Sequence, residues 1–147
     1  MEKRLVLATD APALTALHAE SFGAAAWSLA QIAKSLALET TLGLVAYDGG
    51  EARGFILCQI TEIEAEILTF CVTPLARRKG VGRDLLAAAG KSARQRKAQR
   101  LFLEVAADNA AALALYDQAG FGVIGKRPAY YSHDGKAVDA VMLGTDL

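Results

Sequence analysis

The alternation of short apolar runs with helical runs is the sequence feature that most constrains the fold. Alternating or continuous apolar residues predict strands, and apolar residues three or four positions apart predict helices. On this basis we expect helices over about 11–22, 28–36, 80–98 and 110–119, and strands over about 5–8, 42–47, 54–60, 63–72, 101–105, 121–126 and 137–143. The order βααβββαβαββ is typical of the α/β (α+β) class, with a mixed sheet of about seven strands and helices on both faces.

Turn and cap residues support these boundaries. Asp48-Gly49-Gly50 lies between two strand-like runs and predicts a hairpin. Asp10, Ser28 and Asn109 are suitable N-caps for the first, second and fourth helices, and Gly120 is typical of a helix C-terminus. The second helix is expected to bury one stripe, made of Leu29, Ile32, Ala33 and Leu36.

Composition excludes several classes of protein. The chain has 147 residues, 53% of them hydrophobic, and 16 basic side chains balance 16 acidic ones. These values predict one folded domain spanning 1–147, and they argue against disorder and against a surface that coats nucleic acid or membrane. Cys58 and Cys71 are too few for a disulfide framework or a four-thiolate zinc site, and no metal is expected. With no visible leader or membrane span, we expect a cytoplasmic protein.

The segment 72–83 is the first candidate site. It joins a predicted strand to a predicted helix through a turn in which Gly80 and Gly82 allow a ligand to approach the backbone closely. The N–H groups at a helix start attract anions. Positive side chains surround this turn, at Arg77, Arg78, Lys79 and Arg83. The pattern suits a pyrophosphate, although a solvated basic loop with two turn glycines would look the same.

Glu104 is the second candidate, because it interrupts the apolar strand 101–105. An unpaired buried carboxylate is costly, and burial favours its protonated form. A general base that works near neutral pH needs such an environment. The alternative is a glutamate on an edge strand that faces water.

Tyr116 and Asn109 lie on the helix that follows. A phenol such as Tyr116 can serve as a general acid, although a tyrosine on a helix face is more often packed in the core. Asn109 fits a helix cap better than a ligand contact, and a cap beside a site can be both.

Taken in order, these motifs resemble a known family. Arg77-x-x-Gly80-x-Gly82, after a Val-x-Pro strand end, resembles the acyl-CoA-binding signature of the GCN5-related N-acetyltransferases (GNAT). The RimI-type N-terminal acetyltransferases of that superfamily are similar to this chain at Trp27-Ser28, Leu103-Glu104-Val105, Asn109-Ala110-Ala111-Ala112, Leu115-Tyr116, Gly120-Phe121, Tyr130-Tyr131 and Asp134-Gly135.

The resemblance implies the GNAT fold and acetyl transfer from acetyl-CoA to the N-terminal α-amino group of a ribosomal protein, directly within a ternary complex. It implies a monomer or weak homodimer that binds neither membrane nor nucleic acid. Glu104 would be the general base and Tyr116 the general acid. Residues implied to bind the coenzyme are Phe70, Cys71, Val72, Arg78, Lys79, Gly80, Val81, Gly82, Arg83 and Asn109. Those implied to bind the acceptor are Trp27, Tyr130 and Tyr131.

Two positions depart from the family pattern and keep other acceptors open. Many members have Arg two residues after the base, where this chain has Ala106, and Pro before the Trp, where it has Ala26. A small-molecule amine or a lysine side chain is therefore an alternative acceptor.

Charge patterning leaves a more remote alternative, a non-catalytic module that binds acyl-CoA or nucleic acid. Nine Lys and Arg residues lie within 77–100, but no aromatic residue accompanies them to stack on bases. Three glutamates alternate at Glu62, Glu64 and Glu66. They share a strand face, which is expected to be solvent-exposed and which could otherwise attract a cationic peptide.

Overall fold

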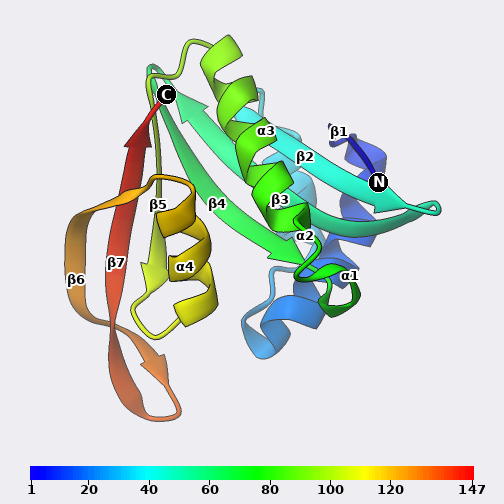
Figure 1. Cartoon of the computed structure of the whole chain (residues 1–147). Coiled ribbons are helices and arrows are strands. Elements are labelled where there is room, and N and C mark those ends of the chain that lie inside the picture. Colours follow the sequence, from blue (N-terminus) through cyan, green and yellow to red (C-terminus); the bar gives the residue numbers. More distant parts are fainter.

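The computed structural model describes residues 1–147 and contains all the expected elements in the expected order (Figure 1). One seven-stranded mixed sheet has the order β1-β2-β3-β4-β5-β7-β6. Its strands are β1 (Glu2–Leu5), β2 (Thr41–Asp48), β3 (Glu51–Thr61), β4 (Glu64–Val72), β5 (Arg100–Ala106), β6 (Gly122–His133) and β7 (Lys136–Asp146). The helices are α1 (Ala11–Phe22), α2 (Leu29–Leu36), α3 (Val81–Gln95) and α4 (Ala110–Gln118).

Two apolar clusters cover the two faces of the sheet. The larger cluster lies between the sheet and α3 and α4, and the smaller one lies between the sheet and α1 and α2. Figure 1 shows α3 and α4 in front of the strands and α1 and α2 behind them. Burial of both faces explains why the inner strands are so apolar, and the expected arrangement of helices on both faces is confirmed.

Strands β4 and β5 form the only parallel pair, and they separate along their length. Their pairing is limited to three positions, the last of which joins Glu66 to Phe102. β4 nevertheless continues to Val72 and β5 to Ala106. The C-terminal halves of the two strands therefore diverge at the middle of the sheet, as Figure 1 shows.

A bulge in β4 changes which side chains face this divergence. The register passes from Ile67 opposite Cys58 to Thr69 opposite Leu57, so Leu68 is an extra residue. Before the bulge, Ile67 belongs to the cluster under α3. After it, the alternation is reversed: Cys71 joins the cluster under α1, and Phe70 and Val72 turn toward α3 and α4.

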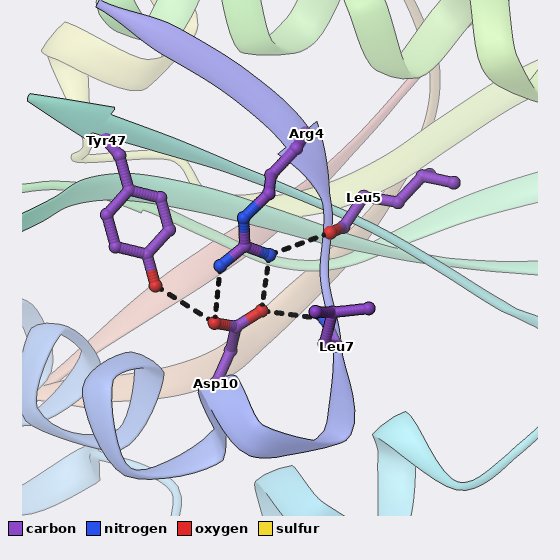
Figure 2. A network of polar contacts seen from close by, with 5 residues as sticks. All are labelled: Arg4, Leu5, Leu7, Asp10 and Tyr47. Carbon is purple, nitrogen blue, oxygen red and sulfur yellow. Dashed lines mark hydrogen bonds and ion pairs between the residues drawn. The ribbon is translucent and has the colours of Figure 1, made fainter. Parts of the chain in front are cut away.

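The N-terminus differs from the prediction, because β1 is Glu2–Leu5 rather than 5–8 and Asp10 does not cap α1. Figure 2 shows why. Arg4 donates two hydrogen bonds of 2.8 Å to the Asp10 carboxylate, the Leu7 N–H donates one of 2.7 Å, and the Tyr47 hydroxyl one of 2.9 Å. This network folds 8–10 into a 3₁₀ turn and ends the strand early.

The network predicts a pH-dependent contribution to stability. Hydrogen bonds from Arg4 lower the pKa of Asp10 from its usual 3.8 to about 2, against the effect of burial. That shift corresponds to roughly 2 kcal/mol of folding stability, and solvent screening at the exposed Arg4 reduces the contribution to about 1–2 kcal/mol. Because the pKa is lower in the folded state, this stabilisation is complete above about pH 4 and is lost as the pH falls through about 2.

Asp10→Asn is therefore expected to lower the free energy of unfolding by about 1–2 kcal/mol at pH 7 and by much less near pH 2. Urea unfolding of both proteins at the two pH values measures the difference. An equal difference at both values would show that the charge of Asp10 is not its cause.

The cap of α2 agrees with the prediction, whereas the buried stripe of α2 and the end of α3 differ from it. Ser28 caps α2 as expected, since its hydroxyl accepts a hydrogen bond from the Gln31 N–H. The predicted buried stripe of α2 is only partly correct: Ile32 is fully buried, but Leu29 is half-exposed and Ala33 faces solvent. α3 ends at Gln95 rather than 98, because the backbone turns left-handed at Lys97.

In this structure, no helix combines the length and apolar character that crossing a membrane requires.

Candidate functional site

A groove of about 610 Å³ lies where β4 ends, between the turn into α3 and the face of α4. Most of the residues predicted to bind the coenzyme line it, namely Phe70, Cys71, Val72, Arg78, Gly80, Val81, Gly82 and Arg83. Lys79 and Asn109 do not line it. Lys79 is exposed in the turn, and Asn109 caps α4 by accepting a hydrogen bond of 3.2 Å from the Ala112 N–H.

The turn into α3 has the backbone geometry of an anion site. Gly80 is left-handed, with φ +80°, and occupies the N-cap position without a side chain that could cap the helix. The first N–H groups of α3 are therefore left for a ligand. Arg78 and Arg83 add positive charge beside them, while Arg77 is tied back by a 3.1 Å hydrogen bond to the Val72 carbonyl.

Gly82 provides the close approach on the floor of the groove. A Cβ at this position would lie 3.5 Å from Phe70, 3.6 Å from Val72 and 3.7 Å from Leu115. These are ordinary contact distances, so a methyl group fits and a longer side chain would enter the groove. The groove therefore suits an elongated ligand that passes close to this backbone.

Tyr116 lines the same groove from α4 and is buried. Its ring packs edge-on against Phe121 at 5.4 Å and lies 6.5 Å from Phe70. Burial raises the pKa of Tyr116 above the usual value of a phenol, so the hydroxyl stays protonated near neutral pH. The hydroxyl donates to no group of the chain and is not fully enclosed, which leaves it free to donate to a ligand.

Glu104 lies on an interior strand, since β5 runs between β4 and β7. The alternative of an edge strand facing water is therefore wrong. Its neighbours Leu103 and Val105 face α3 and α4, so the Glu104 side chain is on the opposite face, where it is 20% exposed. The sequence had suggested an unpaired carboxylate, but Glu104 has a partner: the Arg127 Nε lies 2.6 Å from its Oε1.

Several side chains gather around Glu104 on this face. Burial and the charge of Glu104 raise the pKa of Glu66, and Arg127 opposes that rise. Burial and the charge of Glu104 also raise the pKa of Tyr131, whose ring packs edge-on against Tyr130 at 5.1 Å. The predicted exposed glutamate face is therefore wrong at Glu66, which is half-buried.

Trp27 lies against the helix α1 rather than within this group. Its backbone N–H donates a hydrogen bond of 3.0 Å to Nδ1 of His18, whose Nε2 is 2.8 Å from the Thr69 hydroxyl. Because Nδ1 accepts, Nε2 carries the proton and donates to Thr69. Trp27 makes no polar or aromatic contact with Glu104 or with the tyrosine pair. No sequence motif identified His18 as a site residue. The structure places it between Trp27 and Thr69, which precedes Phe70 in β4.

Two half-sites lie on opposite faces of the sheet where β4 and β5 diverge: the groove with Tyr116, and the group around Glu104. Tyr116 and the groove approach β4 and β5 from the α3–α4 face, and Glu104 with its neighbours approaches from the other. A ligand in the groove and a second molecule beside Glu104 would meet where β4 and β5 no longer pair. Such an arrangement suits transfer of a group between two bound molecules.

The chain belongs to the acetyltransferase (GNAT) family, whose model matches residues 11–121. The ribosomal protein bS18-alanine N-acetyltransferase of Escherichia coli K12 is 34% identical over 140 residues, which are 95% of this chain and 93% of that protein.

Two solved structures share the fold. The crystal structure of the ribosomal-protein-S18-alanine N-acetyltransferase from Escherichia coli superimposes with a TM-score of 0.91 at 30% identity, covering 99% of this chain and 92% of that one. A phosphinothricin acetyltransferase from Sinorhizobium meliloti, in complex with AcCoA, has a TM-score of 0.89 at 20% identity, covering 99% and 88%. The fold and the family resemblance predicted from the sequence are confirmed.

Proposed function

We propose that the protein transfers an acetyl group from acetyl-CoA to the N-terminal α-amino group of a ribosomal protein, directly within a ternary complex. The observation that carries this proposal is the pair of half-sites on opposite faces of the diverging strands β4 and β5. The choice of acceptor is supported by the relatives, which are named as alanine N-acetyltransferases of ribosomal protein bS18 or S18.

The groove fits the coenzyme. The uncapped start of α3, Arg78 and Arg83 would hold the pyrophosphate, and exposed Lys79 would add positive charge. The end of β4, from Phe70 to Val72, would lie along the pantetheine arm. The side-chain N–H₂ of Asn109 is not used by its cap and is available for a further contact.

Glu104 would remove the proton from the acceptor. A free α-amine has a pKa of about 8, so most of it is protonated at pH 7 and must lose a proton before it attacks. Glu104 would accept that proton, directly or through water, on the face where Trp27, Tyr130 and Tyr131 would border the peptide.

Tyr116 would complete the proton balance on the other face. Acetyl-CoA supplies an activated acyl group: one C–N bond forms, one C–S bond breaks, and the departing sulfur needs a proton. The protonated hydroxyl of Tyr116 would donate it. The second proton that the attacking nitrogen loses would then restore the phenol. Backbone N–H groups near Val72, where β4 leaves β5, would stabilise the negative oxygen.

A covalent route through Cys71 is not proposed. Cys71 is among the residues that line the groove, but its side chain belongs to the cluster under α1, on the other face of β4. Burial raises the pKa of the Cys71 thiol to about 12, so little thiolate exists near neutral pH, and neither histidine forms a hydrogen bond with it.

Initial rates of acetyl-CoA turnover against two panels test the proposal. One panel holds peptides that begin with alanine, each with a free or blocked α-amine and an internal lysine, and the other holds small amines. We expect turnover only with the free α-amine peptides. Preference for the blocked peptides would indicate a lysine acceptor, preference for small amines a metabolite, and CoA binding without any turnover would contradict an enzyme.

A further inference from the structure

The contact between Arg127 and Glu104 spans an intervening strand. Glu104 lies on β5 and Arg127 on β6, and β7 runs between them. Arg127 pairs with Ala140 of β7, a buried residue with only a methyl side chain, and Ala140 pairs in turn with Ala106 of β5. Small side chains at both positions leave the guanidinium a path across the sheet to Glu104.

The group around Glu104 carries an excess of negative charge. Glu66 and Glu104 are two carboxylates on one face of neighbouring strands, within electrostatic reach of each other. Arg127 is the one cation paired with Glu104, and it opposes the effect of Glu104 on both Glu66 and Tyr131. A cation is therefore favoured at this position, whether it belongs to the protein or to a ligand.

Arg127 is held loosely enough to leave. Its side chain is 53% exposed, its guanidinium lies 5.4 Å from the centre of the Tyr130 ring, and Glu104 is its only ion-pair partner. The backbone after it is irregular: the three residues between Arg127 and Tyr131 oppose a single residue of β7, Asp139, and Ala129 is left-handed, with φ +51°. Exposed ion pairs of this kind contribute only about 0.2–1 kcal/mol.

Building on the proposed function, we propose that Arg127 occupies the position of the acceptor's ammonium group on Glu104 and is displaced when the acceptor binds. An acceptor that brings its own positive charge replaces the guanidinium without leaving the two carboxylates uncompensated. The acetylated product is neutral at that nitrogen. Once Glu104 has passed the accepted proton to solvent, Arg127 returns to its carboxylate and the product is released. Arg127 is thus a positioning residue that favours charged acceptors.

The experiment follows Arg127 itself during binding. The Nε–H signal of Arg127 is identified in a ¹H–¹⁵N spectrum by its absence in Arg127→Gln. The wild-type protein with bound CoA, which cannot react, is then titrated with a peptide that begins with alanine. The same peptide with an acetylated α-amine is the control ligand. Calorimetry compares binding of the free peptide to wild type, Arg127→Gln, Arg127→Lys and the remote control Arg94→Gln.

We expect the free peptide to shift the Arg127 Nε–H signal toward that of a solvent-exposed arginine, and the acetylated peptide to leave it unchanged. Arg127→Gln should bind the free peptide about two- to five-fold more tightly, the range of an exposed ion pair. Arg127→Lys and Arg94→Gln should match wild type. Peptide binding with an unchanged Arg127 signal, or weaker binding by Arg127→Gln, would overturn the exchange. A wild type that binds CoA but no peptide would instead overturn the proposed function.

Discussion

Glu104→Gln is expected to lower kcat/KM for the acceptor peptide by about 10²–10⁴-fold, the usual contribution of a positioned general base. Glutamine has nearly the same shape as glutamate and keeps an oxygen toward Arg127, but it cannot accept a proton. The rate of the variant should rise with pH as more of the peptide loses its proton to the solvent. Initial rates across pH 6–9.5 at saturating acetyl-CoA measure both effects.

Tyr116→Phe is the comparison for this experiment, because it removes a proton donor from the opposite face and leaves Glu104 intact. Its rate should fall without a steeper dependence on pH. Urea unfolding of both variants checks that the fold is retained. If Glu104→Gln keeps the wild-type rate across the whole pH range, Glu104 is not the base.

Gly82→Leu is expected to weaken acetyl-CoA binding by about 10- to 100-fold. A Cβ at position 82 already touches Phe70, Val72 and Leu115, so the remaining carbons of leucine must occupy the groove. Forcing a ligand past such a side chain costs about 1–3 kcal/mol. Because leucine favours a helix more than glycine does, the free energy of unfolding should change little or rise. Calorimetric titration with CoA measures the loss of affinity.

Gly82→Ala and Gly90→Ala are the matched controls. A methyl group fits at both positions: the nearest atoms would be 3.5 Å away, on Phe70 for Gly82 and on Leu147 for Gly90. Gly90 lies on the same helix, outside the groove. Both controls should bind CoA within a few-fold of wild type. Unchanged affinity in Gly82→Leu would show that the coenzyme does not lie in this groove.

The elements of this fold could be predicted because their signals are local. The turn Asp48–Gly50 forms the expected hairpin, and Ser28 and Asn109 cap the helices assigned to them. Each of these features depends on a few consecutive residues whose backbone preferences agree with the fold.

The features that could not be predicted depend on contacts between distant segments. Asp10 has the chemistry of a helix cap, but Arg4 and Tyr47 bind its carboxylate instead. The bulge at Leu68, which turns Phe70 into the groove, has no signal in the sequence of β4. The partner of Glu104 is two strands away on β6, where the predicted strand had already ended at 126.

Eight of the ten candidate coenzyme residues line one groove, because they occupy the continuous segment 70–83. The surroundings of Glu104 come from four strands, and no single motif contains them. Alternation placed Glu66 on a strand face without showing that it would be half-buried. Tertiary packing therefore decided the surroundings of Glu104, and local sequence placed most of the groove residues.

The most direct test of the two half-sites that meet at the diverging strands is the binding of a conjugate of CoA and a peptide. In this conjugate, an acetyl group joins CoA to the α-nitrogen of a peptide that begins with alanine. Linking two ligands that occupy adjacent sites increases affinity well beyond that of either one. The conjugate should bind at least about 100-fold more tightly than CoA alone, and Gly82→Leu on one face and Tyr131→Ala on the other should each weaken it. A conjugate that binds no more tightly than CoA would contradict the account.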